Sequence, residues 1–154
     1  MTALRISGSL IFSLLLLSLP GAAAAQAVQL PFDQPVAAGG VEAACTGIGS
    51  TAREDPRWTA FPLKVEVAGI AGQYLGDVQL TLSRADGSAV ATVRCAGPWV
   101  LFRVEPGAYT VAGTADSAAA EGRVNVTAEG QARLILRFPE LGGAVSPEHT
   151  PSPD

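Results

Sequence analysis

The sequence has very few residues of the types that act in catalysis or bind metals. It contains one histidine, His149, and two cysteines, Cys45 and Cys95, among 154 residues. His149 lies in a proline-rich C-terminal stretch, where it cannot be held rigidly against a nucleophile as a Ser-His-Asp triad requires. One histidine and two cysteines that can pair with each other also leave no three-ligand metal set. The sequence therefore predicts no catalytic residues, no metal site and no cofactor.

Basic residues are scarce as well. The chain carries 10 Lys and Arg residues against 14 Asp and Glu residues, for a net charge of −4. No run of basic residues is present, so a nucleic-acid backbone is a poor partner. An anionic lipid surface is an equally poor one.

Long hydrophobic runs are absent except at the N-terminus. Ser9 to Leu19 is almost wholly apolar, Arg5 precedes it, and Pro20 ends it. Two A-x-A sequences follow, which is typical of cleavage after Ala25 or Ala27. The run is shorter than the roughly 20 residues of a bilayer span, although a retained membrane anchor is the alternative. We therefore expect a signal peptide over residues 1–27, export to the periplasm or the medium, and no membrane insertion after its removal.

The two cysteines remain after removal of this leader. In an oxidising compartment an even pair is typical of a disulfide, here between Cys45 and Cys95. The alternative is two separate buried thiols.

From residue 61 onward, apolar and polar residues alternate with a period of two, which is typical of strands with one buried face. Turn signals such as Asp86-Gly87 separate the runs. On the third strand the alternation directs Ala91, Val93 and Cys95 to the core and Thr92 and Arg94 to the solvent. The pattern predicts about seven strands: Leu63–Ile70, Asp77–Ser83, Ala89–Cys95, Trp99–Val104, Ala108–Thr114, Gly122–Ala128 and Ala132–Phe138.

The rest of the chain lacks this alternation. Residues 28–60 are interrupted by Gly and Pro, and we expect an irregular N-terminal extension with one short helical turn around Thr51–Trp58, where Thr51 to Glu54 has capping-box spacing. Residues 139–154 contain four prolines and no apolar period, which predicts a disordered tail. The fold class is all-β: an antiparallel sandwich over residues 61–138, with an Ig-like or prealbumin-like Greek key.

Three segments carry a resemblance to a known family. The residues from Gly97 to Val111, GPWVLFRVEPGAYTV, resemble the G-P-W … L-P-P-G-x-Y-x-V hairpin of bacterial carboxypeptidase regulatory-like domains. Gly39-Gly40-Val41 is similar to the start of these domains, and Gln73 to Val78 is similar to the entry into their second strand. The likeness covers residues 38–138. Val104-Glu105-Pro106 departs from Leu-Pro-Pro, and the two cysteines depart from the usual pattern, which makes the disulfide a subgroup trait.

The resemblance implies a small sandwich related to transthyretin that accompanies or supports other proteins without catalysing a reaction. The hydrolases related to transthyretin depend on histidines within the fold, and this chain has none there. In the hairpin, Pro106 and Gly107 suit a tight turn. Tyr109 can turn its ring inward and reach a backbone acceptor with its hydroxyl.

Aromatic residues are the remaining candidates for ligand contact. Trp58, Tyr74 and Trp99 flank predicted loops, where exposed rings could stack on sugars or grip a peptide. The alternative is that Trp58 and Trp99 cap the ends of the core. The sequence therefore supports a non-catalytic exported module that binds or supports an unknown protein or glycan of the cell envelope. A small carbohydrate-binding module is the second hypothesis, and a hydrolase with unrecognised residues is the third.

Overall fold

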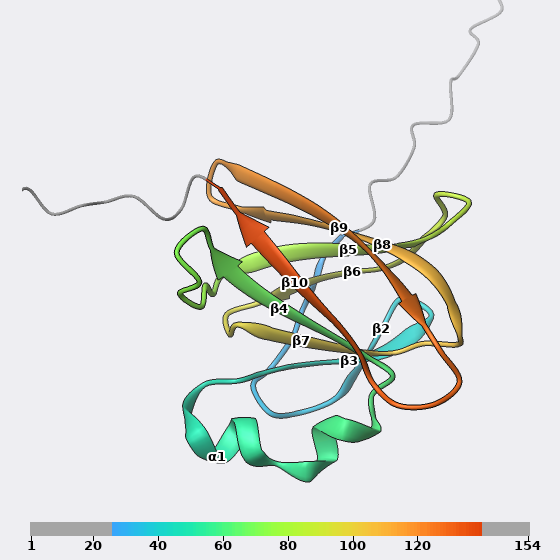
Figure 1. Ribbon diagram of the computed structural model, residues 1–154, viewed down its shortest axis with the longest axis horizontal. Helices are drawn as coiled ribbons and strands as arrows, with labels where there is room; N and C mark the ends of the chain where they lie inside the picture. Colours follow the sequence, from blue (N-terminus) through green and yellow to red (C-terminus); the bar gives the residue numbers. More distant parts are fainter. Residues whose placement is uncertain (1–25, 140–154) are drawn as a thin grey trace, which may run out of the picture.

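The computed structural model describes residues 26–139, which form a sandwich of two five-stranded sheets (Figure 1). The predicted leader up to residue 25, and the tail from residue 140 onward with His149, lie outside the described residues. Within residues 26–139, the all-β sandwich expected from the alternating sequence is confirmed.

Each sheet combines strands from distant parts of the chain. The first sheet has the order β1 (Val28–Gln29), β6 (Ala89–Cys95), β5 (Val78–Arg84), β8 (Gly107–Ala115) and β9 (Ala118–Val126). The second sheet has the order β10 (Ala132–Phe138), β4 (Leu63–Gly69), β7 (Trp99–Arg103), β3 (Val41–Thr46) and β2 (Val36–Ala38).

The prediction of seven strands was wrong, because the described residues contain ten. The three additional strands, β1 to β3, lie in the N-terminal segment that we expected to be irregular. β1 and β2 have only two and three residues, too few to show a period. β3 is six residues long, but of its outward positions Glu42, Ala44 and Thr46 the last two are buried, so its alternation is weak.

The prediction of purely antiparallel sheets was also wrong. β1 pairs with β6 in parallel, and β10 pairs with β4 in parallel over the whole of both strands. Parallel neighbours require a long crossover between them, so no hairpin signal in the sequence announces the pairing.

The core lies between the two sheets and is built from the inward positions of the alternating strands. Ala91, Val93 and Cys95 are buried as expected, while Arg94 is exposed. The largest fully buried side chains include Phe61, Phe102, Phe138, Leu63, Leu80, Leu82, Leu101 and Leu136. Most of this apolar surface comes from β4 to β10, so the alternating region identified in the sequence supplies most of the core.

One predicted turn takes the expected form, whereas the tight hairpin turn expected at Pro106-Gly107 does not form, because β7 and β8 belong to different sheets. Asp86-Gly87 joins β5 to β6, with Gly87 at φ +84° and a hydrogen bond from the Arg84 N–H to the Ser88 carbonyl. The chain bends at Pro106, and Gly107 is already the first residue of β8. Tyr109 is buried and its hydroxyl donates to the Glu105 carbonyl at 2.8 Å. The structural role of Pro106, Gly107 and Tyr109 is therefore to carry the chain from one sheet to the other.

The short helical segment is present but begins earlier than predicted. α1 (Gly49–Glu54) is followed by a 3₁₀ helix, η1 (Pro56–Ala60), and Figure 1 shows both beneath the β3–β7 side of the second sheet. Thr51 lies inside α1, so the predicted capping box does not form. Instead, Asp55 caps η1 by accepting from the Arg57 N–H at 2.9 Å, and the hydrogen bonds from the Arg57 side chain and backbone lower the pKa of Asp55.

The disulfide between Cys45 and Cys95 is formed, with both residues buried. Cys45 lies in β3 and Cys95 in β6, so the bond links the second sheet directly to the first. The bond joins the inner faces of the two sheets, because the N-terminal segment contributes β3, a strand that is not at the edge of the second sheet.

Replacing both Cys45 and Cys95 with serine should lower the midpoint of thermal unfolding by roughly 10 °C. The bond closes a loop with a sequence separation of 50, and its loss would cost about 4 kcal/mol of unfolding free energy in the chain-entropy model. Thermal unfolding followed by circular dichroism, with and without reductant, measures the effect. Reductant should destabilise the wild type and leave the double variant unchanged, and equal midpoints for all samples would contradict the expectation.

Candidate functional site

Two of the three candidate aromatic residues are buried. Trp58 is 3 % exposed and forms a second, smaller apolar cluster with Ala44, Phe61 and Leu101, on the outer face of the second sheet. Its indole N–H donates to the Ala52 carbonyl at 2.8 Å, and the Gln131 amide donates to the Trp58 carbonyl at 2.6 Å. Trp58 therefore holds α1 and η1 against the sheet and presents no ring face for stacking.

Trp99 is also buried, at 8 % exposure, on the same outer face. The Lys64 ammonium lies 4.2 Å from the centroid of its ring. Among the buried side-chain nitrogen and oxygen atoms of residues 26–139, only the Trp99 indole nitrogen has no hydrogen-bond partner. Packing and the Lys64 charge position this ring, and it supports its neighbour Tyr74.

Tyr74 is the one candidate aromatic residue that is exposed, at 46 %. Its ring meets the Trp99 ring edge to face, with centroids 6.5 Å apart, and the Arg53 guanidinium lies 5.6 Å from its centroid. A β-bridge pairs Tyr74 with Ala68, whose partner on the other side is Arg137 of β10. Tyr74, Ala68 and Arg137 therefore lie side by side on the outer face of the second sheet.

The next row of this face is built around a buried carboxylate. Glu66, 2 % exposed, lies between Trp99 and Ile135 in the strand register. Its oxygens accept from the Arg133 guanidinium at 2.6 and 2.7 Å and pair with the Lys64 ammonium at 3.0 Å. Burial acts to raise the pKa of Glu66, but the hydrogen bonds from Arg133 and Lys64 outweigh it, and the pKa lies below its ordinary value of 4.5. The same pairing raises the pKa of Arg133.

A hollow of about 280 Å³ adjoins Tyr74. Tyr74 and Arg53 line it together with Ile48, Leu75, Pro98, Ala96 and three glycines. One of these is Gly47, at φ +96°, where any added Cβ would lie 2.7 Å from the Trp99 ring. Gly47 thus lets the chain turn into α1 while staying in contact with Trp99. The hollow is mainly apolar, with one guanidinium at its rim.

Exposed apolar side chains occur in the segments around this hollow and on the adjoining strand β10. The large hydrophobic residues exposed within residues 26–139 are Phe32, Ile48, Ile70, Tyr74 and Ile135. Ile48 shares the hollow with Tyr74, and Ile70 precedes Tyr74 in the turn after β4. Phe32 lies against Gly97 in the turn beside Pro98, and Ile135 faces outward beside Glu66. We call the exposed residues Ile48, Arg53, Ile70, Tyr74, Ile135 and Arg137 the Tyr74 surface.

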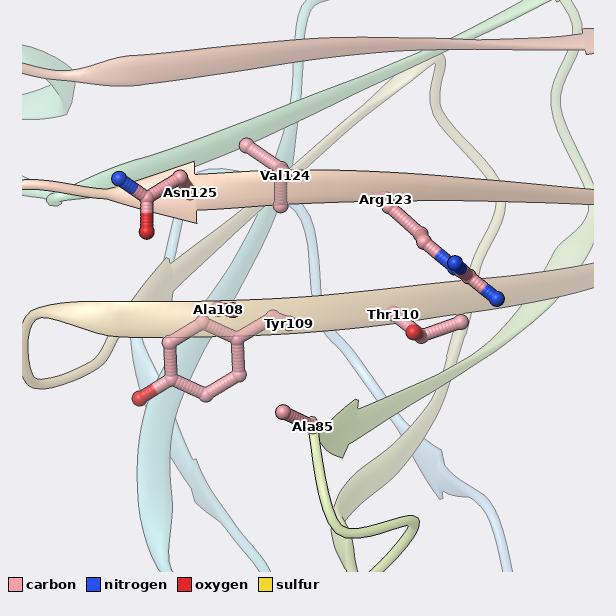
Figure 2. Close-up of a pocket in the computed structure, with 7 residues that line it drawn as sticks. All are labelled: Ala85, Ala108, Tyr109, Thr110, Arg123, Val124 and Asn125. Atoms are coloured by element: carbon pink, nitrogen blue, oxygen red, sulfur yellow. The ribbon is translucent and has the colours of Figure 1, made fainter.

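A larger hollow, of about 460 Å³, lies on the first sheet. Figure 2 shows Arg123 and Asn125 on β9, Ala108 and Thr110 on β8, and Ala85 beyond the end of β5. Arg123 is the only charged residue of its lining, and the Tyr109 hydroxyl is already bonded to Glu105. The residues that line this hollow do not place a nucleophile next to a general base.

Two further properties concern only the part of the chain that the structure describes. No group of three His, Cys, Asp or Glu side chains there is placed to hold a metal ion. No helix there is both long and apolar enough to cross a membrane.

The sequence identified Tyr74 but missed its polar neighbours. Lys64 and Glu66 are two residues apart on a predicted strand, which places them on one face, but the sequence did not show that Glu66 would be buried. Arg133 and Arg137 join them only because β10 pairs with β4, a contact between segments about 70 residues apart. The alternation indicated the face of the sheet to which these side chains point. It could not indicate which residues they contact there.

Glu66→Gln should weaken the dependence of stability on acid. The lowered pKa means that the Glu66 carboxylate stabilises the folded state above its unfolded pKa, and that this contribution is lost as the pH falls through the folded pKa. We expect the thermal midpoint of the wild type to fall more steeply between about pH 5 and pH 3 than that of the variant. Glu121→Gln, at an exposed position of β9, is the matched control and should follow the wild type. Parallel curves for wild type and Glu66→Gln would contradict the expectation.

Comparison with known proteins does not assign a family or a function to the chain. No protein-family model, no curated protein and no solved structure matches the chain. The function is therefore inferred from the surfaces of the molecule itself.

Proposed function

We propose that this protein is a non-catalytic, exported β-sandwich module that binds a protein partner of the cell envelope through the Tyr74 surface. One observation carries the proposal: Tyr74 and Ile48, two of the large apolar side chains exposed within residues 26–139, line one hollow together with Arg53. Scattered single apolar residues are normal on a protein surface, whereas a contiguous group favours an interaction site.

Export is supported by the leader-like residues 1–27 and by the disulfide. The chain places a buried Cys45–Cys95 bond between its two sheets, and such bonds persist in oxidising compartments. A module that works in the periplasm or the medium meets its partner there, after cleavage following Ala25 or Ala27.

The family resemblance supports the same role. The segments that resemble carboxypeptidase regulatory-like domains include Gln73 to Val78, which contains Tyr74, and Gly97 to Val111, which begins at the turn beside the hollow. Domains of this kind accompany or support other proteins. On this proposal the transthyretin-related sandwich is the scaffold, and the loops around Tyr74 form the binding surface.

Carbohydrate binding is the second candidate. It is favoured by the exposed Tyr74 ring beside a hollow that carries the Arg53 guanidinium, since a sugar could stack on the ring and hydrogen-bond to the arginine. It is weakened by the burial of Trp58 and Trp99, which leaves one of the three candidate rings accessible. A glycan array probed with the wild type and Tyr74→Ala separates it from protein binding. A hydrolase is the third candidate, and turnover on an ester, amide and glycoside panel that is abolished by one substitution would establish it.

Tyr74→Ala should reduce capture of the partner at least about fivefold, because tyrosines at the centre of an interface commonly contribute more than about 1 kcal/mol. The test immobilises residues 26–154 and applies the periplasmic and secreted protein fractions of the source organism, with quantitative mass spectrometry of the retained proteins. Thr110→Ala, in the hollow on the first sheet, is the matched control and should retain the same proteins as the wild type.

The outcomes separate the candidate functions. A protein retained by the wild type and by Thr110→Ala, and lost with Tyr74→Ala, supports the proposal. Equal retention by all three forms would show that the Tyr74 surface is not used. Retention of no protein, together with binding to the glycan array that depends on Tyr74, would replace the proposal with the carbohydrate-binding candidate.

A further inference from the structure

We infer that the Tyr74 surface docks an acidic protein segment, one that places carboxylates beside an apolar side chain. The inference deepens the proposed function, on which it rests, by naming the chemistry of the partner. It is drawn from how the structure distributes charge and apolar area around Tyr74.

Two guanidinium groups flank the exposed ring. Arg53 lies over Tyr74 and donates from Nε to the Gly47 carbonyl at 3.0 Å, and Arg137 lies in the same row as Tyr74 across Ala68. Neither arginine forms an ion pair with a carboxylate within residues 26–139, whereas Arg57, Arg103 and Arg133 each do. Arg84, Arg94 and Arg123 also form no ion pair there, but they lie on strands of the first sheet. Arg53 and Arg137 are the two unpaired arginines beside Tyr74, where they can pair with carboxylates of another molecule.

The carboxylate within this face is already engaged. Glu66 shares its carboxylate between Arg133 and Lys64, so the three groups together carry one excess positive charge. The protein as a whole has a net charge of −4, yet two guanidinium groups that form no ion pair within residues 26–139 flank the exposed ring. An acidic partner is complementary to this local charge.

The apolar residues favour a protein segment over a sugar. Ile48, Ile70 and Ile135 are 59 %, 62 % and 38 % exposed, and aliphatic side chains gain most by covering other apolar groups. The hollow beside Tyr74 offers Ile48, Leu75 and Pro98 as walls for one inserted apolar side chain, with Arg53 at its rim. An apolar centre ringed by arginine and tyrosine is the usual composition of a protein interface.

Selection from a displayed library of random dodecapeptides on immobilised residues 26–154 tests the inference. We expect the enriched peptides to carry two or more Asp or Glu residues next to an aliphatic or aromatic residue. Their synthetic forms should bind Arg137→Glu at least tenfold more weakly than the wild type, and binding should weaken as salt rises. Arg123→Glu makes the same charge reversal on β9 and is the matched control, which should bind like the wild type.

The variants must be folded for this comparison, so the thermal midpoint of each is measured first. If Arg137→Glu does not fold, Arg137→Gln removes the charge without reversing it and should still weaken binding. Enriched peptides that are neutral or basic, or that bind the wild type and Arg137→Glu equally, would overturn the inference.

Sodium polygalacturonate and dextran form the second arm of the experiment. Binding of polygalacturonate that depends on Arg137, with no acidic peptide enriched, would assign the surface to an anionic glycan and overturn the inference. Failure of the inference is distinguishable from failure of the proposed function. A protein captured through Tyr74 but insensitive to Arg137→Glu would refute the acidic partner alone.

Discussion

The link between the two sheets is the constraint on which the binding surface depends. Cys45 and Cys95 are both fully buried and join inner positions of β3 and β6. The Gly97 N–H donates to the Cys45 sulfur at 3.4 Å, so the bridge also fixes the turn that leads into β7. That turn supplies Pro98 to the wall of the hollow beside Tyr74. The covalent bond therefore stabilises the sandwich and holds one side of its proposed binding surface in place.

The outer face of the second sheet carries charged side chains next to an apolar cluster. Its middle strands are covered on both sides, because α1 and η1 lie over Ala44 and Leu101 and place Trp58 and Phe61 there. Polar residues on the rest of this face must then be satisfied close to an apolar cluster. Glu66 meets two cations, and the Arg103 guanidinium lies 4.6 Å from the Phe61 ring while pairing with Glu42 at 2.6 Å. The charges of this face are thus largely neutralised next to the helical cover and left unpaired only around Tyr74.

The sequence predicted those strands that have one buried face and one solvent-exposed face. β6 and β10 were predicted with the boundaries that the structure has, although Val90 and Ile135 place apolar residues at outward positions. β3 was missed because its outward positions are Glu42, Ala44 and Thr46, and the last two of these are buried, so that its alternation is weak. The same limit applies to the site. Tyr74 stands out as an aromatic residue near turn signals, but its neighbour Arg137 depends on the parallel pairing of β10 with β4, which no local pattern encodes.

The order of the strands has a consequence for how the protein can be shortened or divided. Among the described strands, β1 pairs with β6, β3 pairs with β2 and β7, and β4 pairs with β7 and with β10, the last strand described. The pairs β1–β6, β3–β7 and β4–β10 each join segments that are far apart in the sequence. Trimming β10 would uncover one edge of the second sheet, and trimming β1 would uncover one edge of the first. Completing both sheets therefore requires contacts that close long loops in the chain.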